Sequence, residues 1–283
     1  MKIYLDAKDL INILERGVPY TANQLEHALR NGGHQLVLSL YSITEIAAPL
    51  NQSSSTMNVM RLLNEVERLP IVFFHPDVDH LELDEAMIAF SRKREYTDVE
   101  PFVNRFDQTV DLSANPATRI LMNYSLGEAV WDLYCNGALK GLESYAPTLR
   151  QLMAADRALT KPPTLKANFI KMIERKLKGY RIKSFATSAS ALGNWIYENP
   201  VRCPSVRLGY EVWHKLVKNK ADALEDSDME DYQHVTCLPY VELMSLDRRM
   251  CGYVEQAGAS LRLDYTHRVF RSAQDIFRHI ERV

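Results

Sequence analysis

Several acidic residues lie at positions where an α/β fold places its functional groups. Asp6 and Asp247 each end a predicted strand, and ligands of parallel sheets bind beyond the carboxyl ends of the strands. Glu45 lies in the first turn of the helix that follows the second predicted strand. Asp231 lies in the helix before the strand that ends at Asp247, and Asp228 lies three residues earlier on the same helix face. We therefore expect these carboxylates to share one edge of a sheet.

Carboxylates that converge on a small space repel one another unless a divalent cation lies between them. Oxygen ligands and this negative charge suit Mg²⁺ or Mn²⁺. Such a site can activate a water molecule and stabilise the leaving oxygen of a phosphodiester. Asp6, Glu45, Asp231 and Asp247 are the predicted catalytic residues. The predicted metal ligands are the same four together with Asp228, which we expect to be a secondary ligand.

Each of these acids also has a structural explanation. Ser42 and Glu45 have the spacing of a capping box, and so do Ser227 and Glu230. Acids in the first turn of a helix also interact favourably with its dipole. His234, three residues after the catalytic helix aspartate, is compatible either with orienting a carboxylate or phosphate or with packing in a core.

Basic residues gather in one part of the chain, although the formal net charge of the whole is only −2. Residues 161–220 carry 13 basic and 3 acidic side chains, and acidic residues are in excess in the rest of the chain. Such a block attracts phosphates, and the alternative interpretation is a solvated helix face. Nucleic-acid contacts are predicted for Arg248 and for the basic residues Lys166, Lys171, Arg175, Lys176 and Lys178.

Short apolar runs and helical periods predict the elements that position these residues. The predicted strands cover Lys2–Leu5, Gln35–Leu40, Ile71–Phe74, Val241–Leu246 and Ser260–Leu263. Up to residue 96 the order is βααβα–αβα, which predicts an α/β fold with a largely parallel sheet flanked by helices. Residues 97–204 have strong helical periods and almost no strand signal. The sequence thus predicts one discontinuous domain, 1–96 and 205–283, that is interrupted by a large all-helical insertion at 97–204.

This arrangement resembles the PIN-like nuclease superfamily. The strand-ending aspartate of the family matches IYLD at Asp6, and its second strand followed by a glutamate matches LVLSLYSITE at Glu45. The late helix-and-strand signature matches SDMEDYQHVTCLPYVELMSLDRRM, with Asp231 and Asp247 at the two acid positions and Asp228 at an auxiliary one. The segment DxxH-x(4)-PY-x(6)-DR is the most specific part of the match. The resemblance implies a metal-dependent endoribonuclease that hydrolyses RNA phosphodiester bonds.

The chain departs from this pattern directly after its first aspartate. PIN-like proteins usually have a small polar residue there, whereas Ala7 and Lys8 follow Asp6 in this sequence. A lysine beside the metal site motivates an alternative, a catalytically weak or inactive PIN-like module that binds RNA or protein. The resemblance also leaves open a toxin or defence effector under the control of a regulatory protein partner. A haloacid-dehalogenase-type phosphatase needs a second aspartate at position 8 and is disfavoured.

Composition sets the broad class of the protein. Hydrophobic residues make up 46% and charged residues 25% of the chain, which is typical of globular proteins. No apolar run approaches the length of a membrane-spanning helix, and MKIYLD does not begin as a signal peptide does. The four cysteines have no paired CxxC spacing, so we expect a cytoplasmic location and no zinc. A homo-oligomer remains compatible with the sequence.

Overall fold

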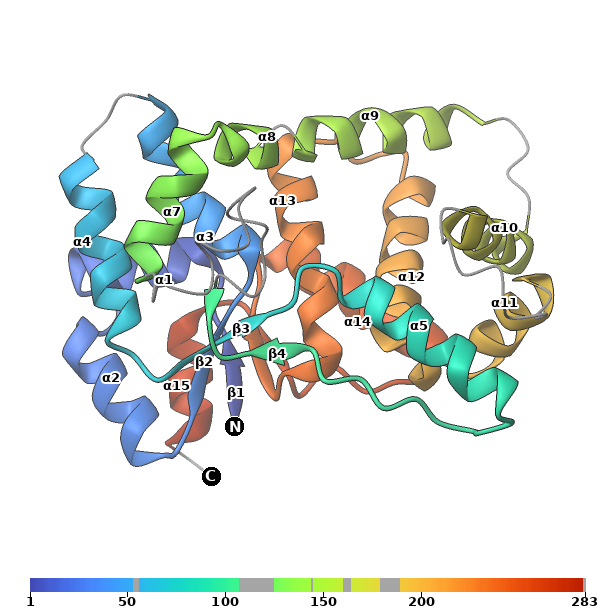
Figure 1. Ribbon diagram of the computed structural model, residues 1–283, viewed down its shortest axis with the longest axis horizontal. Coiled ribbons are helices and arrows are strands. Elements are labelled where there is room, and N and C mark those ends of the chain that lie inside the picture. The colour runs from blue at the N-terminus through green and yellow to red at the C-terminus, as the bar shows by residue number, and fades with distance from the viewer. Residues whose placement is uncertain (53–55, 107–124, 144, 160–163, 179–188, 282–283) are drawn as a thin grey trace, which may run out of the picture.

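The computed structural model describes residues 1–52, 56–106, 125–143, 145–159, 164–178 and 189–281 (Figure 1). Within these ranges six strands form one sheet in the order β4-β3-β2-β1-β5-β6. They are β1 (Lys2–Tyr4), β2 (Gln35–Leu38), β3 (Ile71–Phe74), β4 (Phe102–Val103), β5 (Leu243–Ser245) and β6 (Val269–Phe270). Every pair of neighbours is parallel except β3 and β4. The prediction of an α/β fold with a largely parallel sheet flanked by helices is confirmed.

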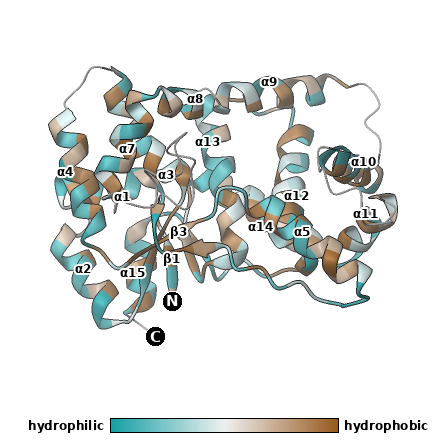
Figure 2. Ribbon diagram, in the orientation of Figure 1, coloured by the Kyte–Doolittle hydropathy of each residue, from teal (hydrophilic) through white to brown (hydrophobic). Residues whose placement is uncertain are grey.

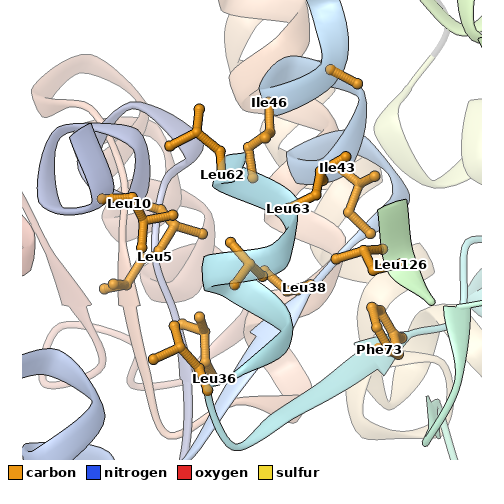
Figure 3. Packing of buried hydrophobic residues seen from close by; sticks show 14 of the residues in the cluster. Leu5, Leu10, Leu36, Leu38, Ile43, Ile46, Leu62, Leu63, Phe73 and Leu126 are labelled. Atoms are coloured by element: carbon orange, nitrogen blue, oxygen red, sulfur yellow. The ribbon is translucent and has the colours of Figure 1, made fainter. Parts of the chain in front are cut away.

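One face of the sheet carries the larger core. Side chains alternate between the two faces of a strand, and Ile3 and Leu5 of the β1 segment pack here with Leu36 and Leu38 of β2 and Phe73 of β3. Figure 3 shows Leu5, Leu36, Leu38 and Phe73 directed toward the helices that cover them. The covering helices are α1 (Ala7–Arg16), α2 (Ala22–Asn31), α3 (Leu40–Ala47), α4 (Thr56–Glu67) and α15 (Ala273–Ile280).

The opposite face carries a second core that is built from the late part of the chain. Tyr4, Val37 and Met244 point to this side from the three central strands. They pack against α12 (Pro204–Lys218), α13 (Asp226–His234), the 3-10 helix η4 (Val235–Tyr240) and α14 (Arg248–Leu261). In Figure 2 the strands are mostly hydrophobic, and the helices have one hydrophobic and one hydrophilic side. Helices that bury a single face are expected to show this pattern.

A third cluster lies apart from the sheet. It joins α5 (Val78–Ser91) to α10 (Leu165–Lys178), α11 (Ala189–Glu198) and the start of α12. Phe169 and Leu192 are buried at its centre. In Figure 1, α10 and α11 lie at one end of the molecule and α2 and α4 at the other, with α13 between them.

The segment 97–204 is mostly helical, but the expectation that it is entirely so is wrong. Its strand β4 pairs with β3 and extends the sheet, a contribution too short for a sequence pattern to reveal. Two of its helices, α7 (Leu126–Cys135) and α8 (Ala138–Glu143), pack into the first core, and α9 (Tyr145–Ala158) packs into the second. Helical periods in the sequence predict two helices that begin at Ile120 and Ala186, and both starting positions lie outside the described residues.

The predicted strand Ser260–Leu263 is also wrong. Helix α14 continues to Leu261, and its buried residues Val254, Ala257 and Leu261 keep the helical spacing. Arg262 then ends the helix with a left-handed backbone (φ 58°). The actual last strand, β6, has only two residues, so it leaves no alternation in the sequence. Within the described part of the chain, no helix is both long and apolar enough to cross a membrane.

Candidate metal centre

Asp6 lies just beyond the carboxyl end of β1, at the position that precedes α1. Its backbone N–H donates to Ser245 Oγ at 2.8 Å, which ties the end of β1 to the end of β5. Its side chain makes no capping hydrogen bond to α1. Asp6 is therefore held at the edge of the sheet where β1 ends.

Glu45 reaches the same edge from α3, which follows β2. The structural explanation through a Ser42–Glu45 capping box is wrong, because Ser39 is the capping residue of α3 and its reciprocal partner is Ser42. The Glu45 carboxylate faces α13 instead, where its Oε1 lies 2.7 Å from His234 Nε2. The helix cap and the functional carboxylate are thus supplied by different residues.

Asp6, Glu45 and His234 together form a group that can hold a metal ion. One ligand atom from each of the three residues lies within 4.8 Å of those of the others. Two of these side chains are half-buried and His234 is buried. Two carboxylates and an imidazole at this spacing suit a divalent cation. The sequence predicts carboxylate ligands alone, and the structure adds the imidazole nitrogen of His234 to the group.

Asp231 and Asp247 add further negative charge beside this group. Burial, together with the carboxylates of Asp247 and Asp6, raises the pKa of Asp231 to about 7. Burial also raises the pKa of Asp6 to about 6; Glu45 acts in the same direction and His234 opposes it. Asp247 caps α14 by accepting the N–H of Met250. The four predicted catalytic acids therefore lie in one electrostatically coupled region, although Asp231 and Asp247 are outside the three-residue group.

Asp228 is not brought into this group. One of its carboxylate oxygens accepts the backbone N–H of Glu225 at 2.8 Å and so caps the start of α13. The other lies 2.8 Å from Arg249 Nη1. The expected Ser227–Glu230 capping box is replaced by one between Glu225 and Asp228. With both oxygens engaged, Asp228 stabilises α13 rather than facing the metal group.

Sequence reasoning did not identify the hydrogen-bond network behind His234. The imidazole Nδ1 is hydrogen-bonded to the Tyr4 hydroxyl, which also lies 2.8 Å from Ser39 Oγ and 2.8 Å from Ser42 Oγ. Burial opposes the charged imidazolium, but Glu45, with the more distant aspartates, outweighs it and raises the pKa of His234. The DxxH spacing was the available signal, because it places His234 one helical turn after Asp231.

The predicted nucleic-acid contacts fall in two places. Arg248 is exposed at the start of α14, directly after Asp247. The others lie on α10, at the end of the molecule away from α1 and α3 (Figure 1). Lys166 pairs with Glu198 at 3.5 Å and Lys176 pairs with Asp79. The remaining three residues of the set are exposed, namely Lys171, Arg175 and Lys178.

Comparison with known proteins assigns no family to the chain. No family model matches its sequence, and neither the curated proteins nor the solved structures gave a match. The function is therefore inferred from the geometry of the site alone, that is, from Asp6, Glu45 and His234 and the neighbouring Asp231 and Asp247.

Proposed function

We propose that the protein is a metal-dependent endoribonuclease that hydrolyses RNA phosphodiester bonds. The observation that carries this proposal is the convergence of Asp6, Glu45 and His234, whose ligand atoms lie within 4.8 Å of one another. Asp231 and Asp247 lie close enough to raise the local negative charge. Such a site fits Mg²⁺ or Mn²⁺, because carboxylate oxygens are suitable ligands for both ions.

The residues of the chain have separable roles in this reaction. When bound, the metal polarises the phosphodiester and lowers the pKa of a coordinated water. Asp6 and Glu45 would hold the cation, and in the metal-free protein His234 keeps the Glu45 carboxylate in place through the 2.7 Å contact. Asp231 and Asp247 accept hydrogen bonds from the attacking water and orient it. Arg248, exposed beside Asp247, pairs with a substrate phosphate.

The assignment to a PIN-like fold is part of the same proposal. The two sequence segments that carry the resemblance, 1–96 and 205–283, supply five strands of the one sheet. Their acids come from the ends of β1 and β5 and from helices α3 and α13. This is the distribution that the resemblance implies, with the late helix and strand completing a site that the first strand begins.

Cleavage of end-labelled single-stranded RNA tests the function. Purified protein should cut the RNA with Mn²⁺ or Mg²⁺ and not with excess EDTA. Asp6→Asn and Asp231→Asn should each lower the rate at least about 100-fold, because each removes a charge that binds the metal or orients the water. Asp264→Asn is the matched control, since Asp264 is exposed and lies outside the group. Equal cleavage by wild type and both site variants would refute the proposal.

A second candidate is a catalytically inactive RNA-binding module. It is favoured by the position of the exposed basic residues of α10, which lie away from α3 in Figure 1. This candidate predicts RNA binding that persists in EDTA and no cleavage with either metal. Metal-dependent cleavage that disappears in Asp6→Asn excludes it.

A further inference from the structure

His234 combines burial with direct access to the metal group. Its side chain is only 1% exposed, yet its Nε2 atom is 2.7 Å from the half-buried Glu45 carboxylate. One ring nitrogen of His234 belongs to the group of ligand atoms that lie within 4.8 Å of one another. His234 is thus the buried member of the group, and the two carboxylates are its half-buried members.

The spacing between His234 and Glu45 fits two ligands of one cation. Adjacent ligands of an octahedral ion with bonds of about 2.1 Å lie roughly 3 Å apart. The Nε2–Oε1 distance of 2.7 Å needs only a small adjustment to reach this value. Without a metal, a proton on Nε2 bridges the two atoms, because an ionised carboxylate only accepts hydrogen bonds. A cation can take the place of that proton.

The residues behind His234 can support either arrangement of the ring proton. In the neutral ring without a metal, a proton on Nε2 leaves Nδ1 to accept the hydrogen bond of the Tyr4 hydroxyl. With a metal on Nε2, Nδ1 carries the proton and donates it to Tyr4, which then donates to Ser39 or Ser42, both 2.8 Å away. The metal displaces the proton of Nε2 and Nδ1 takes up a proton, while the other hydrogens that must turn are on hydroxyl groups, so no heavy atom has to move. Such partners fix the ring and tautomer of a metal-bound histidine.

We infer that His234 is a nitrogen ligand of the metal and that it makes the site prefer Mn²⁺ to Mg²⁺. This inference rests on the metal centre of the proposed function but not on RNA cleavage. Mg²⁺ takes oxygen ligands and keeps several waters, whereas imidazole binds first-row transition metals well. A site with one buried imidazole among carboxylates therefore gains more from Mn²⁺ than from Mg²⁺.

Pulsed electron paramagnetic resonance on the Mn²⁺-loaded full chain tests the ligand directly. Electron spin echo envelope modulation should show coupling to a directly bound nitrogen, and the coupling should change when histidine is labelled with ¹⁵N. Bound Mn²⁺ without nitrogen coupling would overturn this inference and leave the proposed function standing. A chain that binds no Mn²⁺ would overturn both. Nitrogen coupling without RNA cleavage would support the inference and refute the nuclease proposal.

Titration of variants measures the preference between metals. His234→Ala should weaken Mn²⁺ binding at least about 10-fold and change Mg²⁺ binding by less than about threefold, since Mg²⁺ depends on the oxygen ligands. His267→Ala is the matched control, because His267 is exposed and should leave both affinities unchanged. Tyr4→Phe keeps the imidazole but removes its acceptor, and should weaken Mn²⁺ binding about 10-fold. Equal losses for the two metals in His234→Ala would contradict the preference.

Discussion

Arg249 and Asp228 form an ion pair in which the guanidinium Nη1 lies 2.8 Å from a carboxylate oxygen. The pair joins the first turn of α13 to the first turn of α14. Arg249 is two residues after Asp247, and Asp228 is three residues before Asp231. The contact therefore fixes α13, which carries Asp231, relative to α14, which begins directly after Asp247. Arg249 Nη2 also donates to the carbonyl of Ala223 at 2.9 Å, which ties the loop before α13 to the same arginine.

Asp228→Ala should destabilise the protein while leaving its metal site in place. The change removes the cap of α13 and leaves the Arg249 guanidinium without its buried partner, so we expect a loss of about 2 kcal/mol in the free energy of unfolding. Urea denaturation measures this loss. Mn²⁺ affinity at a temperature where the variant is folded should stay within about threefold of wild type. A folded Asp228→Ala variant that binds no Mn²⁺ would show that Asp228 is a ligand after all.

The metal-free protein should lose stability as the pH rises from about 4 to about 7. Burial and neighbouring acids raise the pKa of Asp6 to about 6 and that of Asp231 to about 7, so the folded state favours their protonated forms. The stabilisation is complete below the unfolded-state pKa values and is lost as the pH passes the folded-state values. Melting temperatures measured in EDTA across this range should fall, and Mn²⁺ should reverse the trend because it binds the ionised acids.

The variant Asp231→Asn tests the contribution of one of these two carboxylates to the stability of the metal-free protein. At pH 7.5 and without metal it should melt at a higher temperature than wild type, because it removes a carboxylate that is repelled by Asp247 and Asp6. Asp264→Asn is the control and should melt as wild type does. An Asp231→Asn protein that is less stable than wild type in EDTA would mean that the carboxylate is structural.

The central sheet was predictable because its strands are apolar runs bounded by turn signals. Leu36, Val37 and Leu38 of β2 are buried on both faces of the sheet, and a run of this kind is visible in any window of the sequence. Strands β4 and β6 have two residues each. They form because β3 and β5 offer hydrogen-bonding edges to them. This pairing depends on tertiary structure, so a local sequence pattern does not reveal it.

The acids of the site were predictable, and His234 was a candidate, but the contact between His234 and Glu45 was not predictable. Asp6 and Glu45 follow strands that are neighbours in the sheet, so strand ends alone bring them together. His234 contacts Glu45 across 189 residues of sequence, and no periodicity extends that far. Asp228 has the residue type and helix position expected of a ligand, and only the positions of Arg249 and of the Glu225 backbone N–H show that its two oxygens are already engaged.

Glu82→Ala should be strongly destabilising, because the Glu82 carboxylate joins three elements inside the molecule. It accepts the backbone N–H groups of Ser205 and Val206 at 2.7 and 3.0 Å and the hydroxyl of Tyr240 at 2.8 Å. Removing it leaves these buried donors without an acceptor, so we expect a loss of about 3 kcal/mol in the free energy of unfolding. Chemical denaturation measures it.

A control for that variant lies one turn along the same helix. Glu85 pairs with Arg94 at 2.5 Å near the surface, and Glu85→Gln should change stability by less than about 1 kcal/mol. Burial also raises the pKa of Glu82 to about 7, so Glu82→Gln should remove part of the loss of stability between about pH 4.5 and pH 7. Equal effects of Glu82→Ala and Glu85→Gln would contradict the bridging role.

The exposed basic residues of α10 should contribute to RNA binding, and the paired ones should not. Replacing Lys171, Arg175 and Lys178 by glutamine removes up to three phosphate contacts. The slope of log affinity for single-stranded RNA against log salt should then become shallower by about 2, since each contact contributes about 0.7. Binding is measured at several salt concentrations with the Asp6→Asn chain, so that cleavage does not interfere.

The matched control for this variant is Lys166→Gln with Lys176→Gln on the same helix. These two lysines already face Glu198 and Asp79, so RNA would have to compete with a carboxylate for each of them, and the salt dependence should change little. In the wild-type background, the triple variant should raise KM and leave kcat unchanged, because α10 lies away from the helices that carry Asp6 and Glu45 (Figure 1). If the triple variant bound RNA with unchanged affinity, the exposed basic residues of α10 would be a solvated helix face and not an RNA-binding surface.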